Sequence, residues 1–373
     1  MFLPTPAKEQ FEIQVWKLQI AKVFCKQIAM SIDETLTIPT LPPNVELISH
    51  LAPEIHMLKL MDASDNSAKG ICQVFQSMIQ QTGLTSKGFF GRFQLLGGDL
   101  ATIQNFHCLR NQCAPSAFPE YRMDNIYFQL GASHTLWDIS STLFTHHFGN
   151  PSNMLDCGAW QHLEALGFSL HKAIQKKDFT LMVNQMERVF EALICYCLMV
   201  KRDIHLAKLG SEKVQLPTET WHSIIEECYV DYCTPKARWA AAADKDTKLS
   251  NTLMLFHDFS TVVEAKRLMK AGDVGRLMLI WKKWSIMCQS LNGLNHYATY
   301  LSRTVLLLDR ILPVSMRRYL RHNLLISPSG RPGHFVAKDF WLEIQNYWLK
   351  FFFNKSGQGT QVEKLKNFAM FIL

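Results

Sequence analysis

The sequence lacks the short motifs that mark the most common enzyme classes. It contains no G-x-S-x-G nucleophile elbow, no P-loop, no G-x-G-x-x-G dinucleotide fingerprint and no H-E-x-x-H motif. Its 10 cysteines also form no two clusters at the short spacings that a tetrahedral zinc site requires. These absences exclude the familiar serine hydrolases, nucleotide-binding enzymes and zinc proteases, and they argue against a structural zinc ion.

The chain also lacks a long hydrophobic run. Its longest apolar stretch, residues 192–200, is too short to span a bilayer and is bounded by Glu191 and Lys201. The first residues show neither the basic start nor the apolar segment of a secretory leader. We therefore expect an intracellular protein, nuclear or cytoplasmic, with reduced thiols and no membrane span.

The composition is that of an ordinary folded protein. With 373 residues, of which 48% are hydrophobic, the chain is long enough for about two or three packed units and for a core that needs no disulfide bond. The formal net charge of +7 is compatible with nucleic-acid binding, but many other soluble proteins carry a similar excess. Charge alone therefore does not identify a partner.

Helical periodicity dominates the sequence. Apolar residues recur at helical spacing in segments that predict helices over residues 11–30, 68–82, 136–147, 160–166, 179–208, 218–232, 249–270, 274–291, 294–308 and 340–353. Two short apolar runs, residues 93–96 and 126–130, predict buried strands. The expected fold is mainly α with a small α/β core.

This pattern divides the chain into four consecutive parts. We expect an N-terminal helical segment over residues 1–90 and a small α/β core over residues 91–150. A helical region over residues 151–326 and a C-terminal loop and helix over residues 327–373 follow.

A polar residue follows each predicted strand. Asp99 comes after the first strand and two glycines, and His134 comes shortly after the second strand. Open α/β sheets place ligands at the carboxyl ends of their strands. Asp99 and His134 are therefore the best polar candidates in this half of the chain.

The C-terminal stretch adds a second group of polar residues. Residues 327–333 (SPSGRPG) predict a shaped loop, because proline fixes φ and glycine admits positive φ. In the helix that follows, Asp339, Glu343 and Asn346 fall on one stripe at i, i+4 and i+7. Two interpretations are open: the stripe supplies oxygen ligands for a divalent cation, or it caps and solvates the helix. Arg331 belongs to a basic group around the loop that either contacts phosphates or is a solvated face.

Several histidines predict a second candidate pocket. His146 and His147 lie near Cys157 and His162 in the sequence and could join His134. Adjacent histidines on a helix point in different directions, so at most one of the pair would face a site. Half-buried histidines without a specific function are the alternative interpretation.

The turn at Gly272-Asp273 allows two interpretations as well. It could face a phosphate, because the following helix would present its N-terminal amides. The favoured interpretation is a helix C-cap followed by an aspartate N-cap.

Longer motifs carry a family resemblance. They are residues 97–102 (GGDLAT), 131–137 (GASHTLW), 147–151 (HFGNP), 156–160 (DCGAW), 177–180 (KDFT), 329–336 (SGRPGHFV) and the stripe within residues 339–346. Together they resemble a domain-of-unknown-function family, number 6589, which is abundant in multicopy proteins of mushroom-forming fungi. The resemblance covers nearly the whole chain.

The motifs of this family are similar to those of mobile-element transposases with a ribonuclease-H-like core and a large helical insertion. The resemblance implies that Asp99 is the acid of the Gly-Asp motif and that Glu343 is the last acid, both as ligands of Mg²⁺ or Mn²⁺ in active relatives. It implies a second shell, or contact with phosphate, for four further residues, namely His134, Asp339, Asn346 and Arg331.

The sequence also departs from the family pattern. Ala132 stands where many members carry an acid, and an upstream strand with an Asp-Asn pair would precede the first residue of this chain. The resemblance therefore implies a transposase-derived fragment that lacks its first catalytic acid and is inactive alone, with metal-dependent DNA phosphoryl transfer confined to intact relatives. The alternative is an all-helical protein-interaction module. DNA and protein are thus both possible partners, and the oligomeric state is left open.

Overall fold

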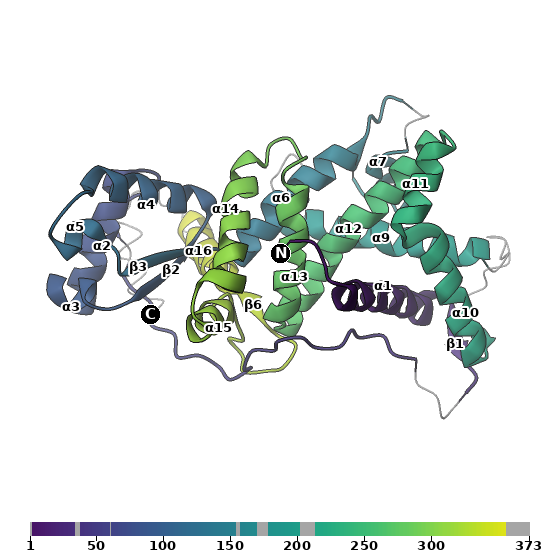
Figure 1. Ribbon diagram of the computed structural model, residues 1–373, viewed down its shortest axis with the longest axis horizontal. Coiled ribbons are helices and arrows are strands. Elements are labelled where there is room, and N and C mark those ends of the chain that lie inside the picture. The colour runs from purple at the N-terminus through teal and green to yellow at the C-terminus, as the bar shows by residue number, and fades with distance from the viewer. Residues whose placement is uncertain are drawn as a thin grey trace. The chain divides into compact units, whose positions relative to one another are not determined.

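The computed structural model describes residues 2–33, 38–59, 61–153, 157–169, 178–201 and 213–355, with side chains up to residue 348 (Figure 1). The chain divides into two compact units. Unit 1 comprises Met1–Val45 and Trp137–Arg267, and unit 2 comprises Glu46–Leu136 and Leu268–Leu373. Each unit thus joins two separate stretches, whereas the four parts expected from the sequence follow the order of the chain.

Unit 1 is built mainly from helices that surround an aromatic core. Trp16 packs against Phe256 with ring centroids 5.3 Å apart, and Phe24 packs against Trp221 at 4.1 Å. Its elements are α1 (Pro6–Gln27), β1 (Ala29–Ser31), most of α6 (Ala132–Phe148), α7 (Ala159–Ala165), α9 (Phe179–Lys201), β4 (Val214–Leu216), α10 (Thr218–Cys228), the π-helix η2 (Tyr229–Cys233), α11 (Pro235–Ala243) and most of α12 (Thr247–Ala271).

Unit 2 contains the α/β part of the chain. Its elements are α2 (Ala68–Thr82), α3 (Ser86–Phe90), β2 (Gln94–Gly98), α4 (Leu100–Cys113), α5 (Pro119–Arg122), β3 (Ile126–Leu130), the start of α6, the end of α12, α13 (Val274–Met287), α14 (Asn295–Leu306), the π-helix η3 (Leu307–Ile311), α15 (Val314–His322), β5 (Leu325–Ile326), β6 (Val336–Ala337) and α16 (Lys338–Lys355).

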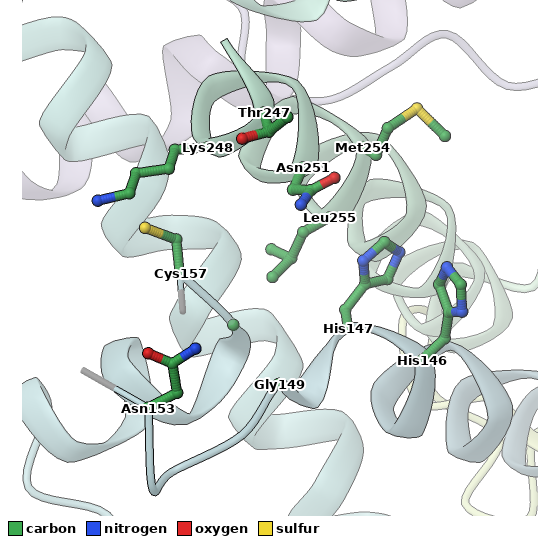
Figure 2. A pocket seen from close by; sticks show the side chains of 11 residues that line it. His146, His147, Gly149, Asn153, Cys157, Thr247, Lys248, Asn251, Met254 and Leu255 are labelled. Carbon is green, nitrogen blue, oxygen red and sulfur yellow. The ribbon is translucent and has the colours of Figure 1, made fainter. Parts of the chain in front are cut away.

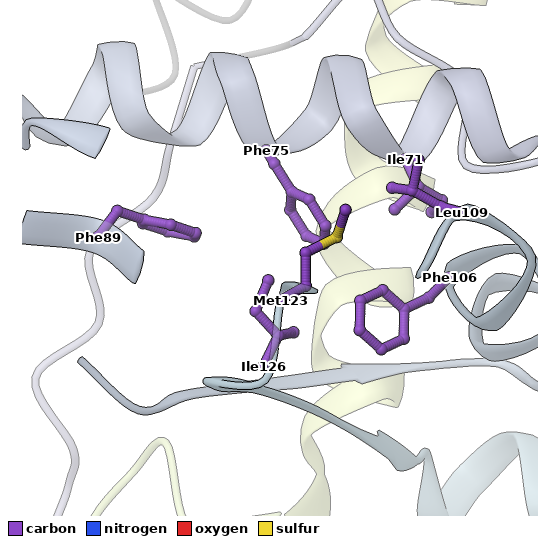
Figure 3. Close-up of a cluster of buried hydrophobic side chains, with 7 residues drawn as sticks. All are labelled: Ile71, Phe75, Phe89, Phe106, Leu109, Met123 and Ile126. Carbon is purple, nitrogen blue, oxygen red and sulfur yellow. The ribbon is translucent and has the colours of Figure 1, made fainter. Parts of the chain in front are cut away.

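Strands β2 and β3 lie side by side and run parallel, with Gln94 opposite Ile126 and Gly98 opposite Leu130 (Figure 1). Parallel strands need a crossover connection, which α4 and α5 supply here. A hydrophobic cluster joins the pair to its helices, and Figure 3 shows side chains from α2 and α4 directed toward one another over the strands. Its buried members are Ile71, Phe75, Phe89, Phe106, Leu109, Met123 and Ile126.

Helix α2 shows why these elements form where they do. Ser67 precedes it in extended conformation, and its hydroxyl accepts a hydrogen bond from the Gly70 amide at 3.1 Å. At the other end Gly83 adopts φ 66°, a left-handed conformation that suits glycine. Ile71 and Phe75 of the predicted apolar stripe are buried, so the prediction for residues 68–82 is confirmed at both ends.

The prediction of a mainly α fold is confirmed, and the described strands are few and short. Both predicted strands and the longer helices are present, whereas α3, α4, α5, α11 and α15 were not predicted. The described strands form three two-stranded sheets, β1–β4, β2–β3 and β5–β6, and they do not show a ribonuclease-H-like sheet.

Among the described helices, none is long and apolar enough to cross a bilayer. Residues 202–208 of one predicted helix lie outside the described residues, as do Asp156 and Lys177 of the family motifs.

Candidate functional site

Asp99 lies immediately after β2, as predicted, and it is the N-cap of α4. Its Oδ1 accepts a hydrogen bond from the Thr102 amide at 2.7 Å, which satisfies one of the N–H groups that a helix start leaves without a partner. Its Oδ2 accepts no hydrogen bond from the residues that the structure describes. Oδ1 of Asp99 thus caps α4, whereas Oδ2 could bind a ligand.

Asp65 supports this helix start from the loop before α2. The Thr102 hydroxyl donates to Asp65 Oδ2 at 2.7 Å, and the Asn105 amide group donates to the Asp65 carbonyl at 2.9 Å. Asp65 does not cap α2 itself, because Ser67 fills that role.

Asp339 sits in the first turn of α16, but its carboxylate caps a different helix. It accepts hydrogen bonds from the backbone amides of Ser133 at 3.2 Å and His134 at 2.9 Å, at the start of α6. The same carboxylate lies 2.9 Å from His134 Nδ1, and only 7% of the Asp339 side chain is exposed. Asp339 therefore fixes both the first turn of α6 and the orientation of the His134 ring.

Gly131 makes this close approach possible. A Cβ atom at this position would lie 2.3 Å from Asp339 Oδ2, so any other residue would displace the carboxylate. The Gly131 amide donates to the Gly98 carbonyl at 2.9 Å, which joins the two motifs across the ends of β2 and β3. The glycine in the motif GASHTLW was the sequence signal for this contact.

The carboxylates of Asp99 and Glu343 also affect the pKa of His134. Burial would lower the pKa of His134, but the hydrogen bond to Asp339 and the charges of Asp339, Asp99 and Glu343 outweigh it and raise that pKa. Burial would likewise raise the pKa of Asp339, yet its hydrogen bonds from His134 and Ser133 hold that pKa below its ordinary value. The four side chains therefore form one electrostatic group.

Glu343 lies one turn after Asp339 on α16 and is half-buried. Within the described chain it forms no hydrogen bond or ion pair. The contacts of the described residues do not bring the side chain of Asn346 or Arg331 to the cluster. Arg331 is exposed in the predicted loop, where its carbonyl accepts from the Ser327 hydroxyl at 3.0 Å.

A cavity of ≈ 190 Å³ adjoins Asp339. Its wall includes Gly131, Ala132 at the start of α6, and Lys338 from α16. The Lys338 ammonium donates to Asn323 Oδ1 at 2.6 Å. The surroundings of Asp339 thus contain both carboxylates and an ammonium group.

A divalent cation at this cluster would have few protein ligands. The described residues contain no group of three or more His, Cys, Asp or Glu side chains that could hold a metal ion. Asp99 and Glu343 could each offer an uncommitted oxygen, with water or phosphate oxygens completing the coordination, as is common for Mg²⁺.

The structure also shows where the two other candidates from the sequence lie, namely the group of histidines and the Gly272-Asp273 turn. His146, His147 and Cys157 line a pocket in unit 1, and neither His134 nor His162 is part of its lining. The Gly272-Asp273 turn is a capping turn, as the favoured interpretation held: Gly272 adopts φ 77°, and Asp273 accepts from the Arg276 amide at 3.0 Å.

Comparison with known proteins identifies a family but no function. The model of a family of unknown function, DUF6589, matches residues 1–372, so the predicted family is confirmed. Neither a curated protein nor a solved structure matches this chain.

Proposed function

This chain belongs to the family of unknown function DUF6589, and we propose from its geometry that unit 2 holds a divalent-cation and phosphate site derived from a mobile-element transposase. One observation carries the proposal. Asp339 contacts His134 where β3 ends, and the charges of Asp99 and Glu343, from other segments of the chain, raise the pKa of the same imidazole. Three separate motifs that converge on one imidazole are better explained by a shared site than by three independent helix caps.

Each residue has a proposed role. Asp99 and Glu343 bind Mg²⁺ or Mn²⁺, because both keep carboxylate oxygens that no described residue uses. His134, positioned by Asp339, donates a hydrogen bond to phosphate.

The proposed activity of this chain is binding without cleavage. Phosphoryl transfer with two metal ions needs at least three well-placed acids to neutralise and orient the metals. The carboxylate of Asp339 is already used by the amides of α6, which leaves Asp99 and Glu343. The parallel pair β2–β3 with an acid at its end, and a second acid on a later helix, is the feature that supports descent from a ribonuclease-H-like core.

The test is a calorimetric titration of Mn²⁺ into the full chain, with and without a short DNA duplex. We expect saturable binding that the duplex strengthens, because phosphate oxygens would complete the coordination of the cation. Asp99→Asn and Glu343→Gln should each weaken binding at least about tenfold, a loss seen even for groups that only surround metal ligands.

Glu120→Gln is the matched control, because this half-buried glutamate on α5 lies in the same unit but outside the cluster. It should bind Mn²⁺ as the parent does. Equal weakening in all three variants would indicate a general loss of negative charge and would remove Asp99 and Glu343 from the proposed site.

A protein-interaction module is the second candidate function. It is favoured by the exposed apolar residues of α16, where Leu342, Tyr347 and Trp348 are each about half exposed. Under this alternative the polar stripe is structural, and a partner covers the aromatic face of the helix. Mn²⁺ binding that neither Asp99→Asn nor Glu343→Gln affects would favour it.

A further inference from the structure

Unit 1 contains a pocket that the proposed function does not use. Its volume is ≈ 580 Å³, which lies within the range of about 300–1,000 Å³ that is typical of small-molecule sites. Figure 2 shows its walls: the end of α6, the described residues Gly149, Asn153 and Cys157 before α7, and the first turns of α12. The lining consists of His146, His147, Gly149, Asn153, Cys157, Gly158, Thr247, Lys248, Asn251, Met254 and Leu255.

The chemistry of this lining favours an anion. Lys248 and the two adjacent histidines supply cationic or hydrogen-bonding groups, and no carboxylate lines the pocket within the described residues. Asn153 and Asn251 place amide groups on opposite walls, and Thr247 adds a hydroxyl (Figure 2). Such groups can donate several hydrogen bonds to one set of acidic oxygens.

His147 is the most firmly positioned of these groups. Its Nε2 lies 2.7 Å from Asp258 Oδ2, and only 9% of its side chain is exposed. Asp258 also contacts His257 Nδ1 at 2.9 Å. Burial would raise the pKa of Asp258, but the hydrogen bonds to both histidines lower it to about 2, so this carboxylate is charged and accepts from Nε2. The other ring nitrogen of His147, Nδ1, therefore remains for a ligand: it is an acceptor in the neutral ring and donates to a phosphate oxygen in the imidazolium form.

Side chains, rather than helix amides, provide the recognition. The first turn of α12 is already capped, because Asp246 Oδ1 accepts from the Leu249 amide at 2.9 Å. Met254 and Leu255 give the pocket an apolar wall. A ligand that fits these surfaces has an acidic group and an organic part.

We propose that this pocket binds a small phosphate monoester. Lys248, Asn251 and His147 contact the phosphate group, and the wall formed by Met254 and Leu255 contacts the organic part. The volume is larger than inorganic phosphate needs, so an ester should bind more tightly than the free ion. This site is independent of the carboxylate cluster in unit 2.

Calorimetry with AMP, ribose 5-phosphate and adenosine tests the proposal on the full chain. We expect both phosphate esters to bind and adenosine not to bind. Lys248→Gln should weaken AMP binding about tenfold, the effect of losing one hydrogen bond to a charged group. Lys236→Gln, at an exposed lysine of α11 outside the pocket, should leave it unchanged.

A footprint of the thiols locates the bound ligand. Cys157 lines the pocket, and Cys108 is an exposed thiol elsewhere in the chain. Iodoacetamide labelling followed by peptide mass spectrometry should show that AMP protects Cys157 and not Cys108.

The proposal would be overturned by no binding of either ester, by equal binding of adenosine, or by AMP binding that leaves Cys157 unprotected. Loss of AMP binding in Glu343→Gln alone would assign the ligand to unit 2 and would also overturn it.

Discussion

Helix α6 carries two histidine–aspartate pairs, and their comparison shows how much the surroundings of a pair decide. Near the first turn, His134 Nδ1 lies 2.9 Å from Asp339. In the last turn, His147 Nε2 lies 2.7 Å from Asp258. In both pairs the aspartate comes from a distant segment and is largely buried. The two pairs are thus similar in geometry.

The groups around the two pairs carry opposite charge. Asp99 and Glu343 add negative charge near His134, whereas Lys248 and no described carboxylate line the pocket beside His147. A site with surplus carboxylates attracts cations, and a site with surplus ammonium and imidazole groups attracts anions. A histidine–aspartate pair therefore does not define a function; its neighbours select the ligand.

The two pairs should also respond differently to pH. Because the folded-state pKa of His134 is raised above 6.5, its stabilising contribution is complete below about pH 6.5 and is lost as pH rises through the raised value. Because the pKa of Asp258 falls from 3.8 to about 2, its contribution is complete above pH 3.8 and is lost as pH falls toward about 2.

The largest effect is expected when Asp258 is removed. Asp258→Ala takes a buried carboxylate away from two histidines and should lower the free energy of unfolding by about 3 kcal/mol, the cost typical of breaking a buried charged pair. Urea denaturation at pH 7 measures it. His257→Gln, at a histidine whose side chain is 26% exposed, should cost clearly less. A loss below about 1 kcal/mol for Asp258→Ala, the scale of a surface pair, would show that the pair does not stabilise unit 1.

A smaller loss is expected at the other pair. Asp339→Ala leaves the amides of Ser133 and His134 without their acceptor and should cost about 2 kcal/mol. Hydrogen exchange of these two amides should accelerate, because the first turn of α6 loses its cap. If the amides of Ser133 and His134 exchange as slowly as in the parent, Asp339 does not stabilise the first turn of α6.

Gly131 provides a second way to test the same contact. Gly131→Ala places a methyl group 2.3 Å from the Asp339 carboxylate position and should destabilise unit 2 in the parent. In the Asp339→Ala background the clash is absent, so the two losses should not add. Additive losses would indicate that Gly131 is needed for another reason.

Parts of this arrangement could be predicted from the sequence because they depend on local patterns. The runs at residues 93–96 and 126–130 are short and apolar, and each ends in glycines and a polar residue, which is the pattern of a buried strand that ends at a site. The stripe of Asp339 and Glu343 follows from helical spacing alone. These patterns identified the members of the cluster around His134.

Other parts depend on contacts between distant segments. Helical spacing could not show that Asp339 caps α6 instead of its own helix. Asp99 was interpreted as a ligand at the end of a strand, which concealed its role as the N-cap of α4 and left that helix unpredicted. The pairing of His147 with Asp258, across 111 residues, leaves no local signal. The pocket in unit 1 was anticipated only as a group of histidines, because Lys248 and Asn251 of its lining come from another segment.

The most direct test of the central claim is the pKa of the His134 ring, measured by NMR titration with and without Mg²⁺. The claim is that Asp99 and Glu343 both act on this imidazole. In the parent we expect the pKa of His134 to lie above 6.5, which is the ordinary value for histidine. Asp99→Asn and Glu343→Gln should each lower it, because each removes a negative charge that favours the imidazolium. Mg²⁺ should lower it in the parent and less in either variant, since the bound cation opposes a second positive charge. A His134 pKa that neither variant changes would show that the carboxylates do not share a site and would contradict the account.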